Sequence, residues 1–459
     1  MVYRIERDSL GEVPVPEQAL WGAQTQRCLV HFPIGREKIP RSVTRALAEI
    51  KRAAAETNRD LGILDAEKAD AIIRVCEEIT SSAMDDQFPL SVWQTGSGTQ
   101  TNMNVNEVIA NRGNAIVGKK LLHPNDDVNL SQSSNDTFPS ALRIAAARGI
   151  VTELQPALRH LISAFAALEL RYPDCVKVGR THLQDAVPLH FAQEVSGWRC
   201  MLERDSDYLQ KATEPLYQLP LGGTAVGTGI NAPENFDKEV TAHLAERTGL
   251  PFCPADNKFQ VLTSLDDVVF AHGALKALAA DLMKIANDIR WLASGPRCGL
   301  GELIIPANEP GSSIMPGKVN PTQCEAVTMV AVQVIGNDTA VGMAASQGNF
   351  QLNAFLPVCA HNVVQSIMLL AEVIETFCIH CVVGIRANTE QMTRNLERSL
   401  MSVTALNPIL GYDKAAEVAK LAHEEGLSPL EAVIRLGYLE EDEARQILDP
   451  RGELKKKST

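Results

Sequence analysis

The most regular pattern in the sequence is a helical repeat of apolar residues between Val261 and Ala293. Apolar side chains recur there every three or four residues, which is typical of a long helix in a bundle. Because this helix is apolar on more than one side, it is predicted to pack against copies from other subunits as well as its own neighbours. The repeat consists of Leu265, Val268, His272, Leu275, Leu278, Leu282, Ile285, Ile289 and Leu292.

Similar periodicity predicts further helices along the chain. Two alanine-rich helices are expected within residues 42–80, and one long helix over 137–170. Helices over 322–345 and 353–381 would complete the bundle. Beyond residue 388 the predicted helices shorten and charged residues return, and the lysine-rich tail is expected to be frayed.

These elements predict a mainly α fold of three domains. A mixed or helical N-terminal domain is expected over residues 1–136, a central domain of long helices over 137–389, and a small helical domain over 390–459. A chain of 459 residues is too long for one compact core. Only 5% of its residues are aromatic, which suits helices that pack closely through small side chains.

The net charge of −13 argues against nucleic acid or an anionic membrane as a partner. An anionic substrate would then need a local cationic pocket. Ten cysteines are scattered without disulfide spacing, and the close pair Cys378 and Cys381 is interpreted as core, so no metal or other cofactor is expected. Reduced thiols and a start without an apolar leader favour the cytoplasm. The uncharged stretch 339–371 carries too many amides for a membrane span.

The strongest chemical signal is the stretch GSSIMPGKVNP over residues 311–321. It combines two hydroxyls with one cation, Lys318, and its glycines let the chain bend. Asn320 followed by Pro321 is typical of a helix start. Hydroxyls, an ammonium and a helix N-terminus around one small volume suit an anion that gains charge during a reaction.

Three other polar stretches precede predicted helices. The stretch 94–104, QTGSGTQTNMN, has small hydroxyls and backbone N–H groups that can hold a carboxylate, and it lacks the lysine of a nucleotide loop. The stretch 131–136, SQSSND, is predicted to end in a helix cap at Asn135 or Asp136. The stretch 179–186, GRTHLQDA, is interpreted as a break before a helix.

These motifs resemble those of the fumarase/aspartase superfamily, and the details are similar to the class II fumarases. The resemblance runs over nearly the whole chain. It implies a three-domain fold whose long helices form a homotetrameric core, with each active site built from three subunits. It also implies reversible hydration of fumarate to (S)-malate in the tricarboxylic acid cycle, by anti elimination through an aci-carboxylate carbanion.

The resemblance also assigns roles to residues of this chain. Ser312 would be the base that removes the C3 proton of malate, and His182, polarised by Glu325, would handle the proton of the leaving hydroxyl. The division of acid and base between Ser312 and His182 stays open. A second dicarboxylate site would comprise His123, Pro124, Asn125 and Asp126. The substrate-binding residues would be Ser97, Gly98, Thr99, Ser133, Ser134, Asn135, Thr181, Ser313, Lys318, Val319 and Asn320.

Three alternatives are weighed against this interpretation. Aspartate ammonia-lyase shares the loop around Ser312, but the stretches around 97, 123 and 133 favour water as the leaving group. A non-catalytic helical scaffold could have lost Ser312, Lys318, His182 or Glu325, and all four are present. The glycines of residues 227–232 fit a loose dinucleotide pattern, but no βαβ unit is predicted around them.

Overall fold

The computed structural model describes residues 2–449 and 454 and is mainly helical, which confirms the predicted fold class. The chain divides into two compact units. Unit 1 comprises Met1–Pro156, Asp205–Ala280 and Val330–Glu372, and unit 2 comprises Ala157–Arg204, Asp281–Met329 and Val373–Thr459. The three-domain division stays a prediction, and the expected frayed tail lies outside the described residues.

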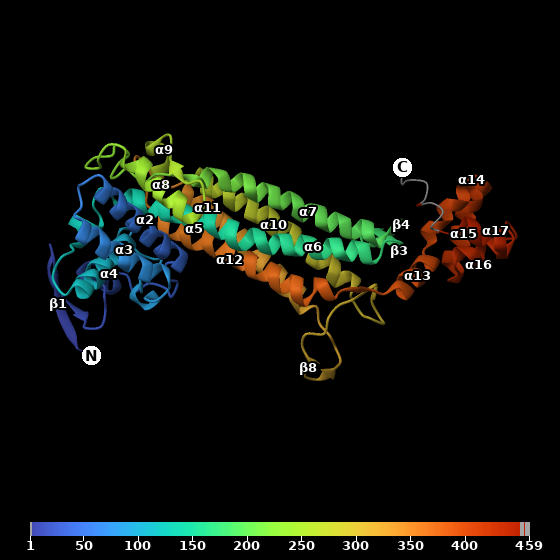
Figure 1. Cartoon of the computed structure of the whole chain (residues 1–459). Helices are drawn as coiled ribbons and strands as arrows, with labels where there is room; N and C mark the ends of the chain where they lie inside the picture. The colour runs from blue at the N-terminus through green and yellow to red at the C-terminus, as the bar shows by residue number, and fades with distance from the viewer. Residues whose placement is uncertain (1, 450–453, 455–459) are drawn as a thin grey trace. The chain divides into compact units, whose positions relative to one another are not determined.

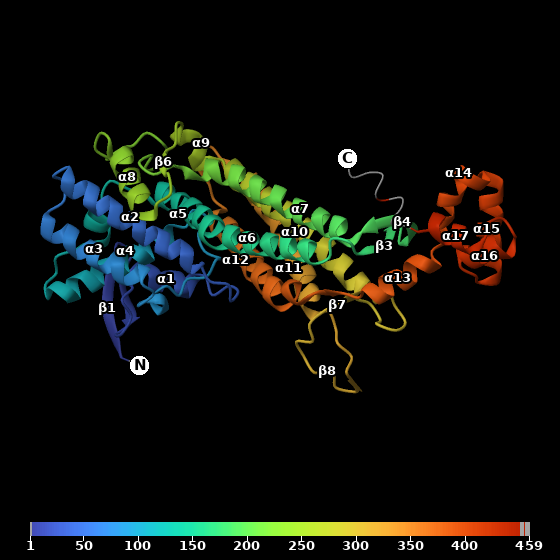
Figure 2. The ribbon, with the colours of Figure 1, turned by 45° about the vertical axis from the view of Figure 1, so that its right-hand side comes forward.

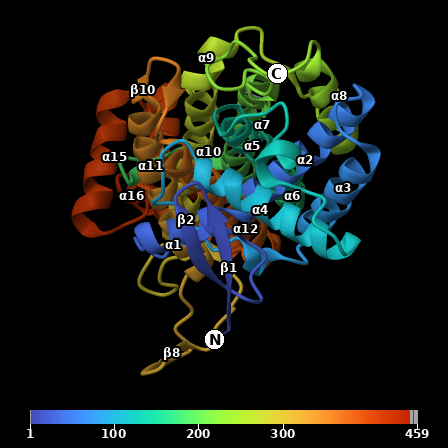
Figure 3. The same cartoon turned by 90° about the vertical axis from the view of Figure 1, so that its left-hand side faces the viewer.

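Unit 1 begins with an antiparallel hairpin and four helices. The two alanine-rich helices expected within residues 42–80 are confirmed as α2 and α3, which lie side by side (Figure 1). Buried alanines such as Ala53 and Ala54 let helices approach α2 closely. The elements are β1 (Tyr3–Asp8), β2 (Gly11–Pro16), α1 (Ala23–His31), α2 (Arg41–Asp60), α3 (Ala66–Thr80) and α4 (Thr99–Val117). Figure 3 shows the hairpin and α4 from another side.

The long helix expected over 137–170 is interrupted by one wider turn. Helix α5 (Ser134–Gly149) passes into a π-helical turn at Ile150–Leu154, and α6 (Gln155–Arg171) follows. The predicted cap at Asn135 or Asp136 is wrong, because the cap is Ser133. Its hydroxyl accepts from the N–H of Asn135 at 3.2 Å, while its own N–H donates to Asp136 Oδ1 at 2.9 Å. This reciprocal capping box starts the helix earlier than expected.

The helix predicted from Val261 begins later. A short helix α9 (Lys258–Thr263) ends at Ser264, which is extended with ψ of 140°, and α10 covers Asp266–Leu292. The Ser264 hydroxyl binds the Asp266 carboxylate at 2.7 Å, so local polar contacts divide the apolar repeat. Before it lie α8 (Phe236–Thr248) and the parallel pair β5 (Gln218–Leu219) and β6 (Cys253–Pro254). The glycines of 227–232 lie in a loop and follow no βαβ unit.

Helices α11 (Thr322–Ala345) and α12 (Leu356–His380) agree closely with prediction. Between them lies a small hairpin of β10 (Gly348–Asn349) and β11 (Leu352–Asn353). By length and composition, α11 and the stretch Leu356–Gly384 could cross a membrane. Core helices of soluble proteins pass the same test, and half of the second apolar window is buried. The pattern is therefore weak support for a membrane span.

Unit 2 carries three of the six strand pairs in the described part of the chain. The hairpin of β3 (Val176–Thr181) and β4 (Gln184–His190) precedes α7 (Phe191–Thr213), and β7 (Leu303–Ile304) pairs with β12 (Arg386–Ala387). Short helices gather after Asn388, as predicted (Figure 2). They are α13 (Thr389–Arg398), α14 (Asn407–Leu410), α15 (Tyr412–Glu425), α16 (Pro429–Arg435) and α17 (Glu441–Ile447).

Candidate active site

In unit 1, three hydroxyls predicted to bind substrate converge where two helices begin. Ser97 Oγ lies 2.8 Å from Thr99 Oγ1, which lies 3.0 Å from Ser134 Oγ. Thr99 is the first residue of α4 and Ser134 the first residue of α5. Helix N-termini present unpaired N–H groups and positive potential. This hydroxyl cluster (Ser97, Thr99 and Ser134) is therefore suited to a carboxylate.

The hydroxyl cluster depends on the glycine at position 98. Gly98 precedes α4 in the left-handed conformation, with φ of 73°. A Cβ atom there would lie 2.3 Å from a ring carbon of Phe138 on α5. Only glycine meets both conditions without displacing the two helix starts. The predicted role of Gly98 thus has a local structural reason.

The start of α5 is fixed by the glycine-rich loop that follows β5. Asn135 Nδ2 donates to the carbonyl of Ala225 at 2.9 Å. The Asp136 carboxylate accepts from the N–H groups of Gly222 at 3.0 Å and Thr224 at 2.8 Å. Burial raises the pKa of Asp136 to about 6, against the opposing effect of these N–H donors. Residues 222–225, which lead into the dinucleotide-like stretch 227–232, therefore brace the predicted substrate segment.

The predicted second dicarboxylate site lies on the surface of unit 1. Pro124–Val128 form one π-helical turn, in which the N–H of Asp126 donates to His123 Nδ1 at 3.1 Å. His123, Asn125 and Asp126 are exposed, and Pro124 is half-buried. The neighbouring Asp127, which the sequence analysis missed, anchors the turn through an ion pair with Lys68.

In unit 2, His182 lies at the tip of the β3–β4 hairpin, and not at a break directly before a helix. Thr181 pairs with Gln184, so His182 and Leu183 form a two-residue turn with φ of 56° and 61°. Both values are unfavourable for residues with a Cβ atom. Thr181, His182 and Leu183 are exposed. Strained residues of this kind concentrate at functional sites.

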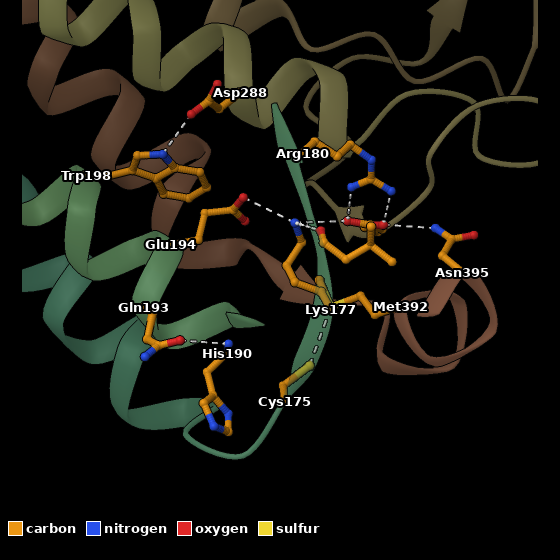
Figure 4. Close-up of polar contacts among 12 residues, drawn as sticks. Cys175, Lys177, Arg180, His190, Gln193, Glu194, Trp198, Asp288, Met392 and Asn395 are labelled. Atoms are coloured by element: carbon orange, nitrogen blue, oxygen red, sulfur yellow. Dashed lines mark hydrogen bonds and ion pairs between the residues drawn. The ribbon is translucent and has the colours of Figure 1, made fainter. Parts of the chain in front are cut away.

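An ion cluster (Lys177, Arg180, Glu194 and Glu302) lies along strand β3 of the same hairpin; Lys177 and Glu302 are buried, and Arg180 and Glu194 are half-buried. Arg180 binds Glu302 through two hydrogen bonds of 3.0 and 2.6 Å. Lys177 lies between Glu194 at 3.1 Å and Glu302 at 3.3 Å, and Asn395 donates to Glu302 (Figure 4). Burial would raise the pKa of Glu302, but Arg180, Lys177 and Asn395 together lower it. This cluster was not predicted from the sequence.

The stretch 311–321 forms a tight turn whose first residues pair as β8 (Gly311–Ser312) with β9 (Met315–Pro316). It stands away from the helices of its own unit in Figures 1 and 2. Ser313, Lys318 and Val319 are exposed, Asn320 is half-buried, and α11 starts at Thr322 after Pro321. Glu325, in the first turn of α11, is exposed. Among the described residues, no ion pair joins His182 to Glu325 within the chain.

Other polar groupings in the structure are less suited to this chemistry. His272 Nδ1 lies 3.1 Å from Asp338 Oδ1 and its Nε2 lies 2.9 Å from Ser366 Oγ, as in the Ser-His-Asp triad of hydrolases. His272 and Ser366 are fully buried, so a substrate has no access to them. A cavity of about 530 Å³ in unit 1 is lined by Arg41, Arg148 and His361 and by none of the predicted site residues. Within residues 2–449 and 454, no group of three or more His, Cys, Asp or Glu side chains is arranged to hold a metal ion.

Comparisons with known proteins identify the family of the chain. The chain matches the lyase family over residues 11–336 and the fumarase C C-terminal family over 403–452. The class II fumarate hydratase of Bacillus subtilis (strain 168) is 55% identical over 462 residues, covering 100% of both chains. That of Thermosynechococcus vestitus is 56% identical, covering 96% of this chain and 95% of its own.

Two solved structures are also similar. The class II fumarase from Schistosoma mansoni has a TM-score of 0.93 and 40% identity, covering 98% of each chain. The native form of the fumarate lyase:delta crystallin from Brucella melitensis has a TM-score of 0.89 and 40% identity, covering 94% of this chain and 100% of its own. The chain therefore belongs to the lyase family. Within that family it is one of the class II fumarate hydratases, which are hydro-lyases.

Proposed function

We propose that the chain catalyses the reversible hydration of fumarate to (S)-malate through an aci-carboxylate carbanion, with the predicted site residues in the roles given above. The observation that carries this proposal is the hydroxyl cluster at the starts of α4 and α5, in a chain whose full-length relatives are fumarate hydratases. One substrate carboxylate binds at Ser97, Gly98, Thr99, Ser133, Ser134 and Asn135.

The second carboxylate needs stronger stabilisation, because it takes up charge when the adjacent C–H bond breaks. Donors fixed in advance stabilise such a charge without reorganising during the reaction. Lys318 supplies an ammonium, Val319 and Asn320 lie next to it before the N-terminus of α11, and Ser313 and Thr181 add hydroxyls. The stretch 311–321 thus binds the developing dianion.

Proton transfer takes place on opposite faces of the substrate. Ser312 removes the C3 proton, activated by surrounding donors and by Lys318. His182, oriented by Glu325, protonates the departing hydroxyl. The positive φ angles of His182 and Leu183 support this role, because the turn holds the imidazole at an exposed tip above a rigid base.

The catalytic form is a homotetramer whose active sites are shared by three subunits. Support comes from apolar side chains left uncovered in the single chain. On α11, Val332 and Met343 are each 63% exposed, and in the stretch 311–321 Ile314 is 83% exposed. Exposed apolar surface of this kind marks interfaces between subunits. Subunit contact would also bring Glu325 of one chain to His182 of another.

The remaining parts of the proposal concern the surroundings of the reaction. The turn around His123, Pro124, Asn125 and Asp126 forms a second dicarboxylate site, supported by its exposed imidazole and amide. The reaction needs no cofactor, and the protein binds neither nucleic acid nor a membrane. It acts in the cytoplasm, as a step of the tricarboxylic acid cycle.

The purified protein tests the proposal directly. Fumarate formation, followed by ultraviolet absorbance, is expected with (S)-malate and is not expected with aspartate. Activity with aspartate instead would make the protein an ammonia-lyase, and no activity with either would support a scaffold. Sedimentation during turnover should show a tetramer, and an active monomer would contradict the shared sites.

A further inference from the structure

Lys51 lies on α2 and its side chain is completely buried, with 0% exposure. Its neighbours on the same helix include the buried apolar residues Leu47 and Ile50. The ammonium donates hydrogen bonds to Asn129 Oδ1 at 2.8 Å and to Gln132 Oε1 at 3.0 Å. Both acceptors belong to the loop that leads into Ser133, the cap of α5.

The two acceptors organise this loop against its surroundings. Asn129 Oδ1 also accepts from Asn102 and Asn106 of α4, each at 3.2 Å. Asn129 Nδ2 donates to the carbonyl of Gln132 at 3.1 Å, which closes the loop on itself. The ammonium therefore braces residues 129–132 against both α2 and α4. The predicted substrate residues Ser133, Ser134 and Asn135 follow immediately.

Lys51 differs from the other deeply buried cations in the described part of the chain, because its partners are neutral. Arg143 is fully buried and forms an ion pair with Asp267 at 2.6 Å, and Lys177 has Glu194 and Glu302. Lys51 has no carboxylate within ion-pair distance among residues 2–449 and 454. A buried charge whose direct hydrogen-bond partners are all neutral is costly. A protein keeps such an unfavourable buried charge where its positive electrostatic potential serves a function.

One buried carboxylate acts on Lys51 from another helix. Asp136, at the start of α5, favours the ammonium in its negative form, whereas Cys76 on α3 is a neutral thiol because burial raises its pKa to about 12. Burial has the larger effect and lowers the pKa of Lys51 to about 7. A neutral amine would still have two N–H donors for its two acceptors. Loss of the proton would thus remove the charge and keep the bracing.

We propose that Lys51 is a positioning residue for dianion binding. Its buried ammonium orders the loop 129–132 and supplies positive potential near the start of α5, to which the hydroxyl cluster contributes Ser134. This inference rests on the proposed function, since it takes the hydroxyl cluster as a binding site for substrate carboxylate. It goes further by assigning part of the selectivity for dianions to a side chain that never touches the ligand.

The test uses Lys51→Met, which nearly conserves volume and removes the charge. We expect kcat/KM for malate to fall about a hundredfold, mostly through KM, because a fixed charge favours the bound dianion as well as the transition state. The inhibition constant of succinate, a dianion that cannot react, should rise in parallel. Circular dichroism and sedimentation establish that the variant is folded and assembled.

Asn58→Leu is the matched control. Asn58 lies seven residues further along α2, is buried, and braces the same loop through Leu130 at 3.1 Å and Ser131 at 2.9 Å. It carries no charge, so its loss should weaken succinate binding much less and leave the pH dependence unchanged. In the wild type, succinate binding should weaken as pH rises through about 7 to 8, because Lys51 loses its proton. Lys51→Arg should restore binding and abolish this dependence, since arginine stays charged.

The outcomes separate this inference from the function on which it rests. A wild-type protein that does not convert malate to fumarate would overturn the proposed function and this inference with it. If the wild type is active and folded Lys51→Met binds succinate as tightly, with the same pH dependence, only the inference is overturned. Equal effects of Lys51→Met and Asn58→Leu would also overturn it, because bracing alone would then explain both.

Discussion

Two buried lysines contact or belong to segments that carry predicted site residues, in two different settings. In unit 1, Lys51 holds the approach to Ser133 through two neutral amide oxygens. In unit 2, Lys177 lies on strand β3 of the His182 hairpin, between the carboxylates of Glu194 and Glu302. Both side chains are almost fully buried.

The difference between them separates two tasks. A cation bonded only to neutral groups has no carboxylate partner at contact distance, which suits a segment proposed to bind a dianion. A cation enclosed by carboxylates is neutralised, and its ion pairs instead fix the geometry of the strands around it. The first region is thus suited to binding, and the second to holding a proton-transfer group rigidly at an exposed tip.

The largest expected effect tests this division at the tip of the hairpin. His182→Asn should lower kcat by about 10²- to 10⁴-fold, because the proposed general acid is removed, with little change in KM. Ser134→Ala is the counterpart in unit 1. It removes one hydroxyl donor and should raise KM about tenfold with a smaller change in kcat. Steady-state kinetics with malate measure both. If His182→Asn changed mainly KM and Ser134→Ala mainly kcat, the division between a binding region and a proton-transfer region would be wrong.

The second effect concerns the base of the hairpin. Glu302→Gln should lower the free energy of unfolding by about 3–5 kcal/mol, because Arg180 and Lys177 lose a shared buried counter-ion. Glu194→Gln is the matched control and should cost about 1 kcal/mol, since Lys177 keeps Glu302 and one Glu194 oxygen has no hydrogen-bond partner. Thermal unfolding measured by calorimetry compares them. Equal losses of unfolding free energy in the two variants would mean that Glu302 is not the main counter-ion of Lys177.

The same cluster sets a pH dependence. The pKa of Glu302 is lowered from 4.5, so the folded state binds its proton less readily than the unfolded state. Its contribution to stability is therefore present above pH 4.5 and is lost as pH falls through the folded-state pKa. In Glu302→Gln, the free energy of unfolding should depend less on pH below pH 4.5. If this pH dependence is the same as in the wild type, Glu302 is not its source.

The smallest effect compares two helix caps. Ser133 caps α5 beside the hydroxyl cluster, and Ser428 caps α16 with the same reciprocal box. Replacing either serine with alanine should cost about 1 kcal/mol of stability. Only Ser133→Ala should also raise KM for malate. A change of KM in Ser428→Ala would show that the binding effect does not come from the start of α5.

The helical part of the fold was largely predictable from the sequence. Apolar spacing over 322–345 matches α11, and the alanine-rich stretches match α2 and α3. Spacing could not show where a local polar contact would interrupt a helix, as Ser264 does with Asp266 before α10. It also could not distinguish Ser133 from its polar neighbours as the cap, because each can accept an N–H.

The least predictable part of the site was the hairpin that carries His182. Its turn lacks the residues that normally mark a two-residue hairpin, so the stretch was interpreted as a break before a helix. The conformation is held by Lys177, Arg180 and Glu302, and Glu302 lies far away in the sequence. A lysine within an apolar face, such as Lys51 beside Leu47 and Ile50, was a signal that could have been noticed. Its partners could not be identified without the structure.

The turn at His182 and Leu183 also limits how far the protein can be stabilised by engineering. A sequence such as Asn-Gly would adopt the same backbone without steric cost and would be the natural choice for a thermostable variant. It would also delete the imidazole on which turnover is proposed to depend. At this position, heat resistance and catalysis therefore compete for the same two residues, and a stability screen without an activity assay would select an inert enzyme.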